Sequence, residues 1–272
     1  MSPLLTSLVS IGVALVCVVV SMGLAALRAR QLGIVAVVDV AWGLGFVLVA
    51  AASGVVALAA GEASWRTALL VALVALWGGR LAWHVRSRAL GEHRGAEDPR
   101  YAEMLGGSLR EVGMGTVVRR VFLVQGVAQW FVSIPVAVGA VLAVSWTWVV
   151  WLGVLVWAVG LYFEAVGDRQ LAAYKAQPRD QRPRVMDQGL WGWTRHPNYF
   201  GDACVWWGLW LAGALASGWV PGLATVLCPV AMTLFLRNVT GAKLLEKKMS
   251  QRDGWDEYAA RVPMFFPRPP RR

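Results

Sequence analysis

The chain has 272 residues, of which 57% are hydrophobic and only 15% are charged, and it contains 16 Trp. Soluble domains usually carry about 25% charged residues, so this composition excludes an ordinary soluble domain and indicates an integral membrane protein. The formal net charge is +10, but no zinc-finger, helix-turn-helix or RNA-binding pattern accompanies it. We therefore expect no nucleic-acid partner.

Apolar stretches that reach or approach the roughly 20 residues of a spanning helix recur along the chain. We predict an all-α integral membrane protein, a single multi-pass domain over residues 1–272, with about seven transmembrane helices. The predicted spans are residues 4–27, 33–59, 66–84, 121–143, 147–167, 203–218 and 220–236. The first run is too long for a signal peptide and has no basic residue before it. The last two are short, so they form either two crossings or one hairpin that does not fully cross.

The basic residues fall in alternate connections between these spans. Residues 85–120 hold seven Arg, residues 168–202 hold six Lys or Arg, and residues 237–272 hold nine, whereas the connections SWTW and SGWVPG hold none. Cytoplasmic loops carry the excess of Lys and Arg. We expect a cell-membrane protein with its N-terminus outside, its C-terminus in the cytoplasm and any active site toward the cytoplasm.

Several kinds of chemistry are excluded by missing residues. The chain has three His in total, too few for a membrane di-iron enzyme, and no HExxH or GxSxG motif. We expect no metal. The three Cys lie in or beside apolar runs and indicate no disulfide. A Rossmann fingerprint and a P-loop are both missing, so a nucleotide cofactor would have to be held by side chains.

The stretch TRHPNYFGD, residues 194–202, places unusual polar chemistry directly before an apolar run. Arg195, His196 and Asn198 are candidates for binding a phosphorylated cofactor, because arginine grips phosphates with two parallel hydrogen bonds. The plainer interpretation is contact with lipid headgroups. We favour that interpretation for the more scattered cations, which are Arg179, Arg182, Lys247, Lys248, Arg271 and Arg272.

Carboxylates inside predicted spans form a second group of candidates. Asp39 lies in IVAVVDVAWGLGF and Glu164 in WAVGLYFEAVGD, with Asp168 one helical turn further on the same face. Charged residues are costly in a bilayer and usually face a polar cavity that serves function. All three could point into one cytoplasm-side cavity. The alternative for Asp39 is a structural ion pair, for example with Arg80.

The segments LYFEAVGDRQLAAYK, RVMDQGLWGWTRHPNYFGDACVWWGLWLAG and LLEKKMSQRDGWDEYAARVPMFFPRPP resemble the C-terminal half of the steroid 5-alpha-reductase superfamily. This likeness covers about residues 160–267. More narrowly, VDVAWGLGF and EDPRY resemble a bacterial branch of that superfamily. The resemblance implies a seven-span reductase that uses NADPH to add hydride to the double bond of an enone, while an acid group polarises the carbonyl.

The resemblance also implies which residues surround NADPH. Three positions depart from the superfamily pattern, which has Asn at Glu164, Arg at Lys175 and Glu at Asp202. With Arg195 and His196 of TRHPNYFGD included, the expected cofactor-binding residues are Glu164, Asp168, Lys175, Arg184, Arg195, His196, Asn198, Tyr199, Asp202 and Arg237.

The substrate side departs further from that pattern. The steroid reductases hold the substrate carbonyl with a Gln-Glu pair in the second span and a Tyr in the third, and this chain has neither there. We expect Asp39 and Tyr101 to be catalytic. Burial would favour the protonated form of Asp39, which could then donate to a carbonyl oxygen. Tyr101 is a fallback donor, with His84 and Tyr162 as further ones. The substrate is expected to be a lipid from the bilayer, either steroid-like, isoprenoid or fatty-acyl.

Two other functions stay open. Integral-membrane methyltransferases of the isoprenylcysteine and phospholipid type carry RHPxYxG-like segments followed by a helix with a carboxylate, and they bind S-adenosylmethionine. TRHPNYFGD and Glu246 in LLEKKM are similar to that pattern. A non-enzymatic lipid-binding role is the third possibility, although it would not need buried carboxylates and an Arg-His-Asn cluster together.

Overall fold

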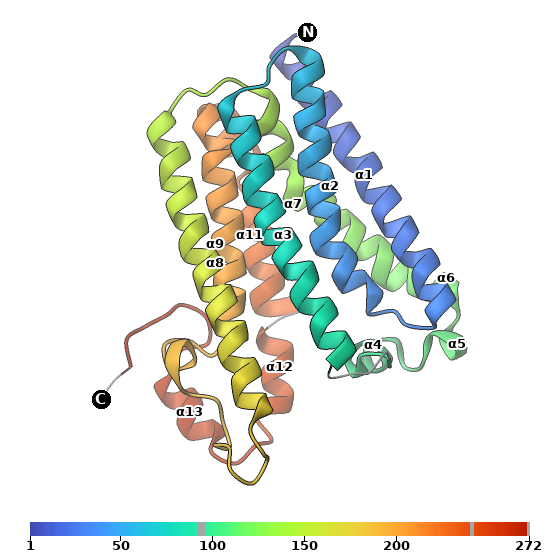
Figure 1. Cartoon of the computed structure of the whole chain (residues 1–272), viewed down its shortest axis with the longest axis vertical. Helices are drawn as coiled ribbons and strands as arrows, with labels where there is room; N and C mark the ends of the chain where they lie inside the picture. Colours follow the sequence, from blue (N-terminus) through green and yellow to red (C-terminus); the bar gives the residue numbers. More distant parts are fainter. Residues whose placement is uncertain (92–95, 240–241, 271–272) are drawn as a thin grey trace. The chain divides into compact units, whose positions relative to one another are not determined.

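The computed structural model describes residues 1–91, 96–239 and 242–270, and every regular element in these ranges is a helix (Figure 1). The chain divides into two compact units, which are described separately below. Unit 1 comprises Met1–Thr147 and Gly213–Thr225, and unit 2 comprises Trp148–Ala212 and Val226–Arg272. The prediction of an all-α integral membrane protein is confirmed at this level, whereas the predicted orientation stays a prediction.

Six helical stretches among the described residues are long and apolar enough to cross a membrane. They are Pro3–Leu32, Val37–Ala60, Trp65–Leu90, Met114–Val141, Thr147–Ala176 and Trp219–Asn238. Each of them contains most or all of one predicted span. The hydropathy pattern therefore located six of the seven expected spans.

The remaining predicted span, residues 203–218, is not among these six stretches. The sequence had left open whether this short run crosses fully. Helix α9 runs from Pro197 to Ala212, only 16 residues. At 1.5 Å per residue it is about 24 Å long, which is shorter than the roughly 30 Å hydrocarbon core. A 3-10 turn, Leu215–Ser217, follows after a short break. The polar stretch TRHPNYFGD thus enters α9 itself rather than preceding it.

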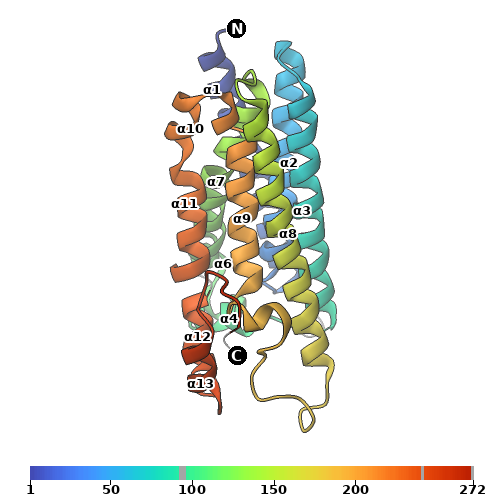
Figure 2. The ribbon, with the colours of Figure 1, turned by 90° about the vertical axis from the view of Figure 1, so that its left-hand side faces the viewer.

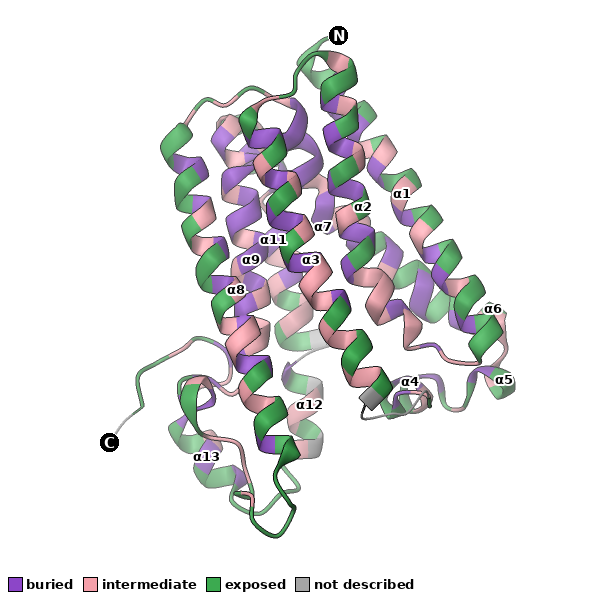
Figure 3. Ribbon diagram, in the orientation of Figure 1, coloured by how far each residue is buried: buried purple, intermediate pink, exposed green. Residues whose placement is uncertain are grey.

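Unit 1 is built around α2 (Val37–Ala60), which packs against α1 (Pro3–Leu32), α3 (Trp65–Gly91) and α7 (Leu123–Val141). Figure 3 shows exposed positions along much of α1. Many of them are apolar and suit a lipid environment, including Leu8, Val16 and Leu24. The buried positions of α2 include several small residues, so its neighbours approach closely.

Short helices connect α3 to α7 at one end of this bundle (Figure 1). They are α4 (Pro99–Leu105), α5 (Leu109–Val112) and α6 (Met114–Val117), followed by a π-helical turn, Val118–Phe122. Asp98 caps α4 by accepting a hydrogen bond from the Arg100 N–H. Glu97 accepts hydrogen bonds from the backbone N–H groups of Val35 and Ala36. The EDPRY stretch is therefore fastened to the start of α2.

Arg66 fastens unit 1 at the other end of α3. Its guanidinium is fully buried and donates to the carbonyl oxygens of Gly139, Leu142 and Gly213 and to the Ser217 hydroxyl. The two α7 carbonyls lie at the helix C-terminus, where a positive charge is favourable. This arginine holds the segment before α10 (Trp219–Thr225) against the end of α7.

Unit 2 begins with α8 (Thr147–Ala176) and continues with α9, α11 (Leu227–Leu234), α12 (Ala242–Met249) and α13 (Trp255–Arg261). Helix α8 extends nine residues beyond the predicted span 147–167. The sequence had indicated that Asp168 and Lys175 lie in a loop, but both lie on this helix. Figure 2 shows α9 between α8 and α11.

Glycines set the distance between α8 and α9. A Cβ added at Gly160 or Gly153 of α8 would collide with backbone atoms of α9, and one added at Gly201 or Gly208 of α9 would collide with backbone atoms of α8. The spacing of seven residues on each helix keeps these glycines on one face. The two backbones therefore pack directly together, which fixes the position of Glu164 and Asp168 relative to the start of α9.

The C-terminal tail closes unit 2. Helix α13 ends at Arg261, and the next residues run in extended conformation beside residues 193–195. The Arg195 N–H donates to the Pro263 carbonyl at 3.0 Å, and the Arg268 N–H donates to the Trp193 carbonyl at 2.9 Å. The Thr194 hydroxyl donates to the Phe265 carbonyl at 2.9 Å.

Candidate functional site

Unit 1 holds a cluster of polar side chains around Asp39, in the first turn of α2. One carboxylate oxygen, Oδ1, accepts a hydrogen bond from the Tyr101 hydroxyl. The other, Oδ2, accepts from the Arg100 guanidinium at 3.1 Å. The side chain of Asp39 is 22% exposed. Asp39 is thus an acceptor at both oxygens, and its ion-pair partner is Arg100 rather than Arg80, which the sequence had suggested.

Arg100 joins two carboxylates. Besides Asp39, it donates from Nε and Nη2 to the two oxygens of Asp98, at 3.1 and 2.8 Å. Burial alone would raise the pKa of Asp98, but the side-chain and backbone hydrogen bonds from Arg100 outweigh it and hold that pKa below its ordinary value. The Arg100 side chain is still 42% exposed, so part of its guanidinium is open to a ligand.

Tyr101 is the most enclosed member of the cluster, with 8% of its surface exposed. Its hydroxyl donates to Asp39 and accepts a hydrogen bond from the Gln125 amide at 3.2 Å. Burial and the Asp39 carboxylate raise the pKa of Tyr101 well above its ordinary value. The hydroxyl therefore keeps its proton at neutral pH. We will call Asp39, Arg100, Tyr101 and Gln125 the tyrosine cluster.

Two members of the tyrosine cluster were not predicted. Gln125 is an amide in the first turn of α7, inside a largely apolar run, and a polar residue in such a place is itself a signal of function or pairing. Arg100 is adjacent to Tyr101 in EDPRY, but sequence alone does not show which carboxylate it meets. The other fallback donors are His84, on α3, and Tyr162, which is 57% exposed, on α8.

A second cluster, in unit 2, is centred on Glu246 of α12. The Arg195 guanidinium donates to its two oxygens from Nε at 2.8 Å and from Nη2 at 3.0 Å. The remaining nitrogen, Nη1, donates to the backbone carbonyls of Ala259 and Val262. All three guanidinium nitrogens of Arg195 are therefore bonded within the chain.

His196 completes this second cluster. Its Nε2 lies 3.0 Å from Glu246 Oε1, its side chain is 2% exposed, and its ring stacks on Tyr199. Burial alone would raise the pKa of Glu246, but the hydrogen bonds from His196 and Arg195 outweigh it and hold the pKa below its ordinary value. We will call Arg195, His196 and Glu246 the glutamate cluster. It ties α9, α12 and the tail together.

The other predicted cofactor residues are distributed along α8 and α9. The Asn198 amide donates to Asp168 Oδ1 at 3.1 Å and accepts from the Tyr199 N–H. Asp168 and Glu164 are both buried on one face of α8. Asp202 follows Asn198 by one turn of α9. The helix pair thus places four predicted residues close to its Asn198–Asp168 hydrogen bond.

The predicted cations are more exposed. Lys175 ends the helical face of Asp168, and Arg237 lies in a π-helical turn after α11, both on the surface. Arg184 pairs with Asp253 at 2.8 Å, and both side chains are about three-quarters exposed, at 75% and 76%. Such exposed pairs contribute little to stability, so Arg184 is available to bind an anion.

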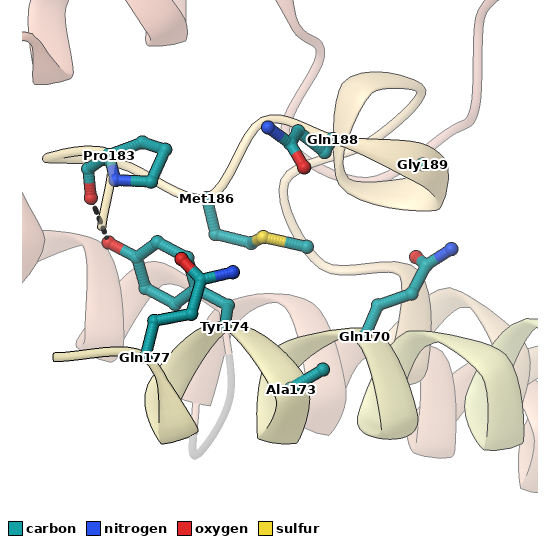
Figure 4. A pocket seen from close by; sticks show the side chains of 8 residues that line it. All are labelled: Gln170, Ala173, Tyr174, Gln177, Pro183, Met186, Gln188 and Gly189. Carbon is teal, nitrogen blue, oxygen red and sulfur yellow. Dashed lines mark hydrogen bonds between the residues drawn. The ribbon is translucent and has the colours of Figure 1, made fainter. Parts of the chain in front are cut away.

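A cavity of about 250 Å³ lies between the end of α8 and the following loop (Figure 4). It is lined by Gln170, Ala173, Tyr174, Gln177, Pro183, Met186, Gln188 and Gly189. The three α8 residues among these, Gln170, Ala173 and Tyr174, follow a helical face that is turned roughly half a revolution from that of Asp168. None of the ten predicted cofactor residues lines this cavity, so it is separate from the residues discussed above.

Among the described residues, no group of three or more His, Cys, Asp or Glu lies close enough to hold a metal ion. The tyrosine cluster offers a hydroxyl donor beside a cation, and α8 and α9 offer further polar side chains.

Fold and clusters together define a multi-pass helical membrane protein with buried polar groups at its helix ends. The family model described as DUF1295, protein of unknown function, matches residues 27–262. The chain belongs to this family. Searches of the curated proteins and of the solved structures find no match to it.

Proposed function

We propose that this protein is a membrane-embedded NADPH-dependent reductase that adds hydride to an activated carbon–carbon double bond of a lipid. The lipid is steroid-like, isoprenoid or fatty-acyl and enters from the bilayer. The observation that carries the proposal is the tyrosine cluster. It holds a neutral hydroxyl, that of Tyr101, between Asp39 and Gln125 and beside the guanidinium of Arg100.

Such an arrangement suits the substrate half of enone reduction. When hydride reaches the β-carbon of a conjugated carbonyl compound, negative charge develops on the carbonyl oxygen, and a donor aimed at that oxygen stabilises the transition state. Tyr101 can supply the proton once its O–H turns from Asp39 to the substrate. The partly exposed Arg100 supplies a fixed positive charge next to it.

The resemblance to steroid 5-alpha-reductases supports the same assignment. Those enzymes are expected to hold the carbonyl with an acid, a glutamine and a tyrosine from their second and third spans. In this chain groups of the same three kinds meet from other elements, Asp39 from α2, Tyr101 from α4 and Gln125 from α7. Asp39, which the sequence suggested as the donor, becomes the acceptor that orients Tyr101.

The cofactor assignment rests on the donor set of unit 2. Lys175, Arg184 and Arg237 are exposed cations that fit the phosphates of NADPH, and the hydrogen-bonded Asn198–Asp168 pair offers amide and carboxylate groups to ribose or nicotinamide. When bound, NADPH would supply the hydride. We assign Arg195 and His196 a supporting role, because their side chains are bonded to Glu246.

The overall reaction is balanced by one proton. The double bond accepts hydride at the β-carbon and a proton at the α-carbon, so that substrate, NADPH and H⁺ yield the saturated product and NADP⁺. Tyr101 releases its proton to the substrate and regains one from the cytoplasmic solvent. Our proposal places this chemistry at the cytoplasmic side of the cell membrane.

The first test is cofactor binding by the full-length protein in detergent, measured by thermal unfolding with NADPH, NADH and S-adenosylmethionine in parallel. Occupancy at 100 times the dissociation constant stabilises a protein by about 2.7 kcal/mol. We expect NADPH to raise the unfolding temperature, and Lys175→Ala with Arg184→Ala to reduce that increase. The matched control is Arg179→Ala, another exposed cation of the same region. No stabilisation by either nicotinamide nucleotide would refute the proposal.

A second candidate function is favoured by one specific observation. Glu246, on a helix after the apolar hairpin, contacts both Arg195 and His196 of TRHPNYFGD. The membrane methyltransferases that use S-adenosylmethionine combine an RHPxYxG-like segment with a carboxylate on a C-terminal helix. Stabilisation by S-adenosylmethionine alone would place this function first. The tyrosine cluster favours reduction, since methyl transfer needs no proton donor for a carbonyl oxygen.

A further inference from the structure

The hydroxyl of Tyr101 has one donor and two acceptor positions. Its proton is directed to Asp39, and one lone pair accepts the Nε2–H of Gln125 at 3.2 Å. Among the described residues, no donor bonds to the other lone pair. Gln125 therefore determines the direction from which the remaining side of the hydroxyl can be approached.

Gln125 is well placed to act on Tyr101 without touching a substrate. It lies at the start of α7, and one turn later Gln129 donates from its own amide to the Trp42 carbonyl of α2 at 2.7 Å. The two glutamines share one face of α7. Gln129 bonds to α2 directly, and Gln125 bonds to Tyr101, which in turn bonds to Asp39 of α2. Only Gln125 contacts the tyrosine.

The charged groups that face Tyr101 are Asp39 of α2 and Arg100 of α4. Asp39 stabilises the neutral hydroxyl, whereas Arg100 and the Gln125 N–H stabilise a phenolate oxygen. An amide N–H can donate to the oxygen both before and after the proton leaves. The amide thus offers the same bond in both states, and that bond strengthens as negative charge develops.

We propose that Gln125 is a positioning residue, which fixes the Tyr101 oxygen for proton transfer and stabilises the phenolate that the transfer leaves behind. This inference rests on the proposed function for its role in catalysis, but its physical content concerns Tyr101 alone. It extends the predicted pair of Asp39 and Tyr101 by a third side chain that comes from a different helix.

The test is a titration that needs no substrate. The full chain is prepared in detergent with 2,3,5-trifluorotyrosine at position 101 only. Its phenol is far more acidic than that of tyrosine, which brings the titration to lower pH, and its ¹⁹F signal is followed against pH. Loss of a hydrogen bond to a charged group moves a titration by roughly one pH unit. We expect Gln125→Leu to move the midpoint upward by about that amount. Gln129→Leu, one turn away on the same face, is the matched control and should leave the midpoint in place.

A second variant covers the case in which Gln125→Leu does not fold. Gln125→Glu has nearly the same shape, removes the N–H donor and adds negative charge, so it should move the midpoint upward as well. A midpoint that is unchanged or lowered in whichever variant folds would overturn the inference.

Catalysis gives an independent readout. If NADPH-dependent reduction is found, Gln125→Leu should lower kcat roughly 10-fold or more with little change in KM, as expected for an interaction made in the transition state. A change in KM alone would overturn the positioning role. If no cofactor binds, the titration still tests the contact between Gln125 and Tyr101, so the two proposals fail separately.

Discussion

The two polar clusters of this protein differ in what their side chains leave open. In the glutamate cluster, all three nitrogens of Arg195 are bonded to Glu246 or to tail carbonyls, and His196 is 2% exposed. In the tyrosine cluster, Arg100 is 42% exposed, and the described residues supply one donor for the two acceptor positions of the Tyr101 hydroxyl. The glutamate cluster is suited to hold helices and tail together, whereas the tyrosine cluster is suited to bind a ligand.

This difference teaches caution about conspicuous motifs. TRHPNYFGD is the densest polar stretch of the chain, yet its arginine and histidine bond to α12 and the tail. The residues with open chemistry are dispersed over α2, α4 and α7. A dense run of polar residues in a sequence therefore does not show whether those residues bind a ligand or hold the fold together. That depends on which groups their side chains bond to in the folded protein.

The largest effect on stability is expected from a substitution that breaks the glutamate cluster. Arg195→Ala leaves Glu246 with His196 alone and removes the donor to the carbonyls of Ala259 and Val262. Removal of one partner from a largely buried ion pair costs about 3–5 kcal/mol. We expect a large drop in unfolding temperature in detergent. Arg184→Ala, which breaks the exposed pair with Asp253, is the control and should cost less than about 1 kcal/mol. Equal, small effects would show that Arg195 has no stabilising role.

The next effect separates catalysis from stability in the tyrosine cluster. Tyr101→Phe removes one hydroxyl, so stability should fall by only about 1–2 kcal/mol. The rate of NADPH oxidation with a long-chain enone should fall about 100-fold or more, the usual contribution of a positioned acid. His84→Phe, which changes another predicted donor outside the cluster, is the comparison and should retain activity. Full activity in Tyr101→Phe would remove Tyr101 from the mechanism.

The smallest effect concerns pH and the glutamate cluster. The hydrogen bonds from His196 and Arg195 hold the pKa of Glu246 in the folded protein below the ordinary glutamate value of 4.5. Its ionised form therefore stabilises the fold at pH values above about 4.5, and this stabilisation is lost as the pH falls through the lower folded pKa. Between pH 7 and pH 3.5, the unfolding temperatures of wild type and Glu246→Gln should converge by a few degrees.

The control for this measurement is Glu257→Gln, an exposed glutamate on α13. It should run parallel to the wild type over the whole range. A constant gap between wild type and Glu246→Gln would show that the charge of Glu246 does not contribute to stability.

The sequence predicted well what depends on local composition. Spanning helices follow from runs of apolar residues, and six of them appear near the expected positions. The different bounds of the run 203–218 have a local cause as well, since α9 begins at Pro197 within the polar stretch and ends at Ala212. Apolarity continues through the 3-10 turn that follows, so hydropathy could not show where the helix stops.

Within the candidate site, the sequence singled out Asp39, Tyr101 and Glu246 one at a time, from charge in an apolar setting or from motif resemblance. Their partners were decided by the tertiary structure. Asp39 meets Tyr101 and Arg100 more than 60 residues away, Glu246 meets Arg195 across 51 residues, and Gln125 reaches Tyr101 from another helix.

What the sequence by itself determined was therefore an all-α membrane protein and a short list of polar residues, because burial in lipid limits both composition and secondary structure. What only the tertiary structure decided was which donor faces which acceptor. A hydrogen bond depends on distances of a few tenths of an ångström between side chains from different elements, and the packing of α2 with α7 and of α8 with α9 sets those distances.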